Sequence, residues 1–180
     1  MSMKRFLCLL VLPLVSVGLS TVFASEPGNI RVEFVHPERF SDFRIQGRSE
    51  IASVPIFRDQ ISDYLSPLVT RRFPGKTLTL RFTDIDLAGR LEPWRIRRFN
   101  DVRFERDLQS PLRLYFDYTL TDSKGTVLAV GPQSILDQDY LHKYIDYPIS
   151  FSLEPLFYEK VNLANWVRQL APSAPGLARN

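Results

Sequence analysis

Alternating apolar and charged residues mark the first predicted strand of this chain. From Ile30 to Val35 every second side chain is apolar, which is the period-two pattern of a strand with one buried face. His36 and Pro37 interrupt the pattern. We therefore predict a strand over residues 30–35, followed by a loop.

Apolar residues at helical spacing follow between Ser53 and Arg72. One broad face of this segment is apolar and the opposite face is charged, as in a helix that packs on a core. Ser53 is the predicted N-cap, and Pro55 fits the first turn. Pro67 is expected to kink or split the helix near its end. The apolar face consists of Ile56, Ile61, Tyr64, Leu65, Leu68 and Val69.

Short β-rich runs occupy the middle of the chain. Strands are predicted over residues 77–83 and 102–106 from their alternation. Two longer runs, 112–121 and 126–132, flank Asp122-Ser123-Lys124-Gly125, which is a typical hairpin turn sequence. The hairpin is the strongest local signal in the sequence.

The last third of the chain returns to helical spacing. Residues 135–144 fit neither period, whereas Pro155 to Leu170 repeats apolar residues at the spacing of a helix. Residues 172–180 are rich in Pro, Ala and Gly, and we predict a flexible tail there.

The order of these elements predicts an α+β fold. A strand, a helix, several strands with a hairpin and a second helix most simply form an antiparallel-rich sheet of four to five strands. Both helices would pack on one face of that sheet. No internal repeat is visible, so residues 30–171 are predicted to form a single domain.

An export signal precedes this domain. Lys4 and Arg5 are followed by an apolar run, and Val22-Phe23-Ala24 has the small-residue pattern that a signal peptidase cleaves. Cleavage near Ala24-Ser25 would remove residues 1–24 and leave 25–29 as a short linker. The alternative is an uncleaved membrane anchor, because the run is nearly long enough to cross a bilayer. We expect a periplasmic or secreted protein with no stable anchor after cleavage.

Removal of the signal also changes the chemistry of the chain. The only cysteine, Cys8, leaves with it, so disulfide and thiol chemistry are not expected in the mature protein. The net charge of +3 loses the two positive charges of Lys4 and Arg5. The remaining charge is too small to predict nucleic-acid binding.

Two aspartates raise a problem for the strand predicted over residues 77–83. If that strand continued, Asp84 and Asp86 would point to the same side as the apolar residues Leu78, Leu80 and Phe82. Buried carboxylates need partners. The strand is therefore expected either to end at Thr83 or to carry the two aspartates at an edge where partners exist.

Two interpretations of this aspartate pair remain open. The pair could bind a cation, with Glu92 as a third oxygen ligand. Alternatively, it could cap the turn that Gly89 completes and form salt bridges with Arg90 or Arg95. We favour the second interpretation, because the acidic residues are too sparse for a dedicated calcium loop and no histidine cluster accompanies them. No metal or other cofactor is therefore expected.

A basic, aromatic stretch follows. Trp94, Arg95, Arg97 and Arg98 could form a surface that binds an anionic ligand or a protein partner, since Trp and Arg are frequent interface anchors. The simpler interpretation is a solvated strand face of alternating charges, because acidic residues interleave with the arginines. These acidic residues are Glu92, Asp101, Glu105 and Asp107.

Neither histidine predicts an active site. His36 fits a turn, and His142 lies in a polar, aromatic stretch where a general base is conceivable. A catalytic triad also needs a positioned nucleophile. Ser134 and Ser150 lack the glycine-flanked setting of a nucleophile elbow.

Three motifs of this chain resemble the family catalogued as domain of unknown function 3016. The run from Arg31 to Asp42 resembles its opening motif, and Thr83 to Trp94 resembles its central motif. The segment from Pro155 to Trp166 is similar to its closing helix, whereas residues 133–152 depart from the family pattern. The resemblance implies a secreted bacterial protein, expected in the periplasm. It implies no activity, so no catalytic residue is carried over.

We therefore expect a non-enzymatic binding or envelope-associated domain. Its candidate site comprises Asp84, Asp86, Glu92, Trp94, Arg95, Arg97 and Arg98. The expected partner is an envelope protein or an anionic ligand. The alternative is a metal-assisted hydrolase that uses the acidic residues near Asp84 and Asp86.

Overall fold

The computed structural model describes residues 29–91, 103–104, 110–143 and 154–171. The elements follow one another along the chain in the order β1 (Ile30–Phe34), η1 (Pro37–Arg39), α1 (Glu50–Arg72), β2 (Thr77–Asp86), β3 (Arg90–Leu91), β4 (Arg103–Phe104), β5 (Leu112–Thr121), β6 (Val127–Asp137), α2 (Tyr140–Lys143) and α4 (Phe157–Gln169). The predicted signal, its cleavage site and the tail 172–180 lie outside the described residues.

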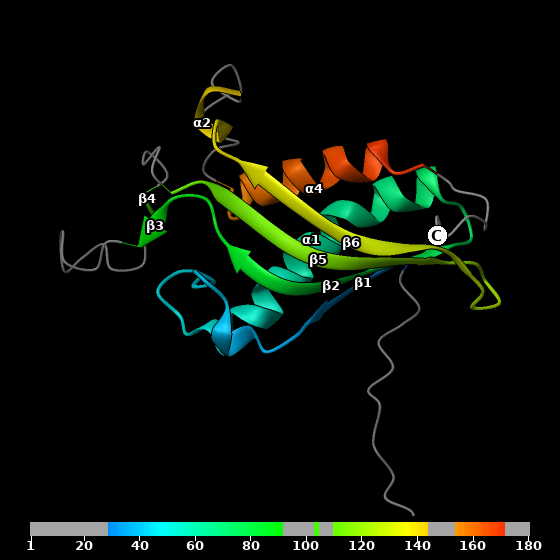
Figure 1. Cartoon of the computed structure of the whole chain (residues 1–180), viewed down its shortest axis with the longest axis horizontal. Helices are drawn as coiled ribbons and strands as arrows, with labels where there is room; N and C mark the ends of the chain where they lie inside the picture. The colour runs from blue at the N-terminus through cyan, green and yellow to red at the C-terminus, as the bar shows by residue number, and fades with distance from the viewer. Residues whose placement is uncertain (1–28, 92–102, 105–109, 144–153, 172–180) are drawn as a thin grey trace, which may run out of the picture.

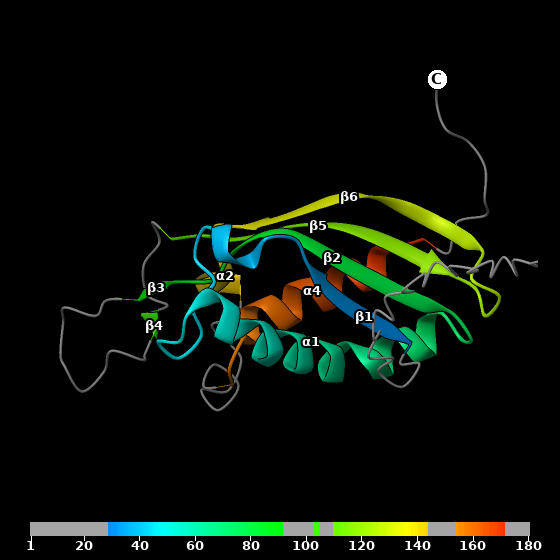
Figure 2. The same ribbon diagram turned by 90° about the horizontal axis from the view of Figure 1, so that it is seen from below.

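Two layers make up the described structure. β1, β2, β5 and β6 form a curved sheet in that spatial order, and α1 and α4 pack side by side on one of its faces (Figures 1 and 2). The α+β class and the placement of both helices on one face are confirmed. Among the described residues, no helix is long and apolar enough to cross a membrane.

The sheet is mixed rather than purely antiparallel. β1 pairs with β2 in parallel, with Ile30 opposite Leu78, whereas β2–β5 and β5–β6 are antiparallel. The parallel pair arises because α1 carries the chain back along the sheet before β2 begins, as in a βαβ unit.

Helix α1 begins one turn earlier than predicted. Ser49 is the N-cap, and its hydroxyl oxygen accepts a hydrogen bond from the Ala52 amide at 3.3 Å. The prediction of Ser53 as N-cap is wrong, because its side chain is fully buried and accepts from the Ile45 amide. Pro67 does not split the helix. It lies on the exposed side, where the carbonyl that loses its donor can be hydrated.

The predicted hairpin is present between β5 and β6. The Asp122 carboxylate accepts hydrogen bonds from the Lys124 and Thr126 amides, both at 2.8 Å, and Gly125 adopts a positive φ of 83°. The hydrogen bond from the Thr126 backbone is the largest cause that lowers the pKa of Asp122. β6 runs on to Asp137, so the ambiguous stretch after residue 135 is first strand and then the short helix α2.

Phenylalanine rings form a continuous line through the core between sheet and helices. The Phe57 ring on α1 lies 5.3 Å from that of Phe82 on β2, and the Phe82 ring lies 5.3 Å from that of Phe116 on β5. Trp166 of α4 continues the line at 5.0 Å from Phe116. The rings therefore connect α1, the middle of the sheet and α4 in one core.

Candidate functional site

A β-bulge resolves the conflict that Asp84 and Asp86 pose in the sequence. Phe82 pairs with Phe116 of β5, but Asp84 pairs with the next residue, Tyr115, so Thr83 is an extra residue in β2. The extra residue reverses the alternation of the strand. Ile85 beyond it is therefore fully buried, and the two aspartates turn to the open face of the sheet.

Both aspartates have protein partners on that face. The Asp84 carboxylate accepts hydrogen bonds from the Ser41 amide and hydroxyl, each at 2.7 Å, and from the Ile85 amide at 2.9 Å. Asp86 forms an ion pair with Arg113 of β5 at 3.0 Å. These contacts join the loop that follows β1 to β2, and β2 to β5.

The structure does not describe the remaining members of the predicted acidic site. Glu92, the proposed third ligand, and Arg95, a proposed salt-bridge partner, fall outside the described residues. Within the part of the chain that the structure describes, no group of three or more Asp, Glu, His or Cys residues could hold a metal ion.

The predicted Trp/Arg surface also falls outside the described residues. Trp94, Arg95, Arg97 and Arg98 belong to segment 92–102, which joins β3 to β4. The ends of this segment are described, since Leu91 pairs with Arg103 and Arg90 with Phe104 across the antiparallel β3–β4 ladder. The ladder lies at the same end of the molecule as α2 (Figure 1).

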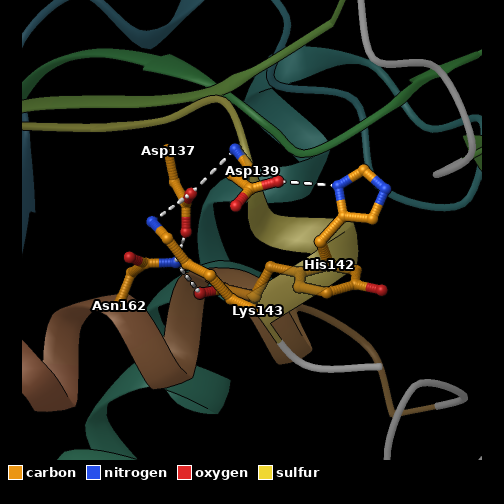
Figure 3. A network of polar contacts seen from close by, with 6 residues as sticks. Asp137, Asp139, His142, Lys143 and Asn162 are labelled. Atoms are coloured by element: carbon orange, nitrogen blue, oxygen red, sulfur yellow. Dashed lines mark hydrogen bonds and ion pairs between the residues drawn. The ribbon is translucent and has the colours of Figure 1, made fainter. Parts of the chain in front are cut away.

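A buried carboxylate at this end of the sheet was missed by the sequence analysis. Asp137 closes β6, and its side chain is only 1% exposed. It accepts hydrogen bonds from the Lys143 ammonium at 2.6 Å, from the Asn162 amide at 3.0 Å and from the Asp139 backbone at 3.1 Å (Figure 3). Through these bonds Asp137 joins β6, α2 and α4.

A second buried carboxylate joins β2 to α4. Glu159 is 3% exposed and accepts a hydrogen bond from the Ala88 amide at 2.9 Å, directly after β2 ends. Because both buried carboxylates accept hydrogen bonds from other elements, their arrangement supports a structural role at this end of the sheet.

His142 forms a dyad with Asp139 on the surface of α2. Its Nδ1 lies 2.7 Å from the Asp139 carboxylate, and both side chains are more than half exposed (Figure 3). Such a pair orients an imidazole as a general base requires. Among the described residues, however, no hydroxyl or thiol is hydrogen-bonded to the ring. The dyad therefore lacks a described nucleophile.

Comparison with known proteins identifies a family but no curated relative. A family model described as "Protein of unknown function (DUF3016)" matches residues 28–169, which is well over half of the chain. No curated protein matches, and no solved structure matches.

Proposed function

We propose that this chain, which belongs to the DUF3016 family, is an exported, non-enzymatic domain that binds an anionic ligand or an envelope protein. The proposed contact residues are Trp94, Arg95, Arg97 and Arg98. The observation that carries the proposal is the pairing of Leu91 with Arg103, which brings the two ends of segment 92–102 together at one end of the sheet.

The composition of the segment supports a partner with acidic or phosphate groups. It carries three arginines and a tryptophan against two acidic residues, Glu92 and Asp101, so its net charge is positive. Arginine binds carboxylates and phosphates through two parallel hydrogen bonds, and tryptophan supplies a large apolar contact area. A partner with exposed acidic or phosphate groups is therefore proposed.

The contacts of the other candidate residues favour binding over catalysis. Asp84 accepts hydrogen bonds from Ser41, and Asp86 is paired with Arg113. In the described structure the His142–Asp139 dyad contacts no nucleophile. A hydrolase would need these groups to face a substrate and to share a metal ion or a reactive oxygen.

Capture of partners from an envelope extract tests the proposal. Tagged wild-type protein would be compared with Trp94→Ala and with Arg97→Ala/Arg98→Ala. The matched control is Arg31→Ala/Arg81→Ala, which removes the same charge from exposed positions on the open face of the sheet. We expect the partner set to be lost in the first two variants and retained in the control. Identical partner sets in all four samples would contradict the proposed contact residues.

A further inference from the structure

A cavity of about 250 Å³ opens between α1 and α4, on the helical layer. It is lined by Tyr64, Pro67, Leu68 and Arg71 of α1 and by Ala164 and Arg168 of α4. Of these residues, Ala164 is 1% exposed, whereas Tyr64 is 41% exposed. The lining thus combines apolar side chains with two guanidinium groups, and none of its residues is acidic.

The two helices run parallel, so both C-termini lie at the arginine end of this cavity. Arg72 of α1 donates a hydrogen bond to the Leu170 carbonyl at the end of α4 at 2.9 Å. Lys160, near the start of α4, donates to Gln60, which lies three turns before the end of α1. The start of α4 therefore contacts the middle of α1, and the end of α4 contacts the end of α1. This order of contacts requires the two helices to run parallel.

Arginines outweigh the negative helix ends at this location. Each helix C-terminus contributes about half a negative charge. Three arginines occupy the last turns, namely Arg71 and Arg72 on α1 and Arg168 on α4. Arg72 caps the end of α4, which leaves Arg71 and Arg168 as a positive surplus beside the cavity.

The two cavity arginines retain free hydrogen-bonding capacity. Arg168 donates from Nη1 to the Asn165 side chain at 2.7 Å, which occupies only one of its donors. Arg71 is exposed and forms no ion pair or hydrogen bond through its side chain within the described part of the chain. An anion at this position would therefore displace no carboxylate of the residues that the structure describes.

On α1, Tyr64 lies two turns before Arg71 in the cavity lining, and its ring is contacted from α4. The Lys160 ammonium lies 5.8 Å from the centroid of the Tyr64 ring, and the Lys160 side chain is 8% exposed. This contact fixes the ring from the side of α4. Tyr64, Leu68 and Ala164 thus supply the apolar part of the lining, and Arg71 and Arg168 supply the charged part.

From this geometry we propose a second binding site, between α1 and α4, for a small anion with a short apolar body, such as a carboxylate or a phosphate ester. The apolar body lies on Tyr64, Leu68 and Ala164, and the anionic group binds Arg71 and Arg168. The site is separate from segment 92–102 and does not depend on the function proposed above. Its size suits a short chain or one ring.

Titration of the purified protein with octanoate, followed by residue-resolved NMR, tests the site. We expect shifts to cluster at the cavity-lining residues. Octanol, which lacks the charge, and acetate, which lacks the apolar body, should each bind about tenfold more weakly or less. Octyl phosphate is titrated in the same way. If it binds more tightly than octanoate, the site prefers a phosphate group; if octanoate binds more tightly, the site prefers a carboxylate.

Variants separate the site from adventitious amphiphile binding. Arg71→Gln and Arg168→Gln should each weaken octanoate binding about fivefold. Arg58→Gln is the control, because Arg58 is also exposed on α1 but pairs with Asp59 away from the cavity. The proposal is overturned if octanol binds as tightly as octanoate or if the shifts map to the sheet. It is equally overturned if both cavity variants behave like Arg58→Gln.

Discussion

Replacing Asp137 by alanine tests whether the network at the end of β6 holds this part of the fold together. The substitution removes a carboxylate that is 1% exposed and that accepts three hydrogen bonds, from Lys143, Asn162 and the Asp139 backbone. After the change, Asn162 keeps its bond to the Tyr158 carbonyl, whereas the Asp139 amide loses its partner.

The expected loss of unfolding free energy depends on how deeply each hydrogen-bond partner of Asp137 is buried. Breaking a fully buried ion pair costs about 3–5 kcal/mol. Lys143 is 50% exposed and can return to water, which reduces the penalty. The orphaned amide and the lost charged hydrogen bond to Asn162 remain. We therefore expect Asp137→Ala to lower the free energy of unfolding by about 2–3 kcal/mol.

Urea denaturation followed by circular dichroism measures this change. Asp139→Ala is the matched control, because Asp139 is an aspartate two residues away that is 60% exposed and pairs only with a surface histidine. We expect the control to lose about 0.5 kcal/mol. A loss below about 1 kcal/mol for Asp137→Ala, or equal losses in both variants, would refute a structural role for the network.

Three further predictions concern the hairpin, the α1–α4 contact and the acidic pair. Gly125→Ala should lower the melting temperature by about 2–4 °C, because φ is 83° while the space around the residue is open, so only backbone strain contributes. Burial is the largest cause that lowers the pKa of Lys160 below 10.5. Between the lowered value and 10.5 the unfolded chain binds more protons, so the stability of the wild type should rise with pH relative to Lys160→Met in alkaline urea titrations. A flat difference between the two proteins would contradict the lowered pKa. Calorimetric titration with calcium, magnesium or manganese should give no binding heat, since Asp84 and Asp86 already have protein partners; saturable heat that Asp84→Ala abolishes would revive the hydrolase alternative.

Local pattern was sufficient to predict the hairpin and most element positions. The turn from Asp122 to Gly125 depends on residues within four positions of one another, and its sequence specifies its geometry. Helix α1 was placed correctly apart from its first turn. Ser49 and Ser53 both suit an N-cap by residue type. They are distinguished only by the tertiary structure, in which the Ser53 hydroxyl accepts a hydrogen bond from the Ile45 amide.

Long-range features could not be predicted from the sequence. The bulge at Thr83 follows from the register between β2 and β5, which are far apart in the chain. The sequence therefore predicted that the strand ends at Thr83 or carries Asp84 and Asp86 at an edge, whereas β2 runs on to Asp86 between β1 and β5 and the two aspartates do have partners. The parallel pairing of β1 with β2 was similarly missed, although a strand–helix–strand order is compatible with it.

Asp137 shows why the candidate site was only partly anticipated. It follows Leu136, which is exposed. At this point of β6 the apolar side chain therefore faces solvent and the charged side chain is buried. The carboxylate is buried only because Lys143 and Asn162, from two other elements, converge on it. The Asp137-x-Asp139 sequence before Tyr140 was the available signal, since such residues often precede a helix.

Site-specific photo-crosslinking in intact cells tests the central proposal most directly. A photoreactive phenylalanine analogue, which keeps an aromatic ring at the position where Trp94→Ala removes it, would replace Trp94 in one sample. In another it would replace Tyr115, which is 43% exposed on the open face of the sheet. If segment 92–102 binds the partner, position 94 should give a discrete crosslinked species that Arg97→Ala/Arg98→Ala removes, and position 115 should give none. Equal crosslinking from both positions, or none from position 94, would contradict the account.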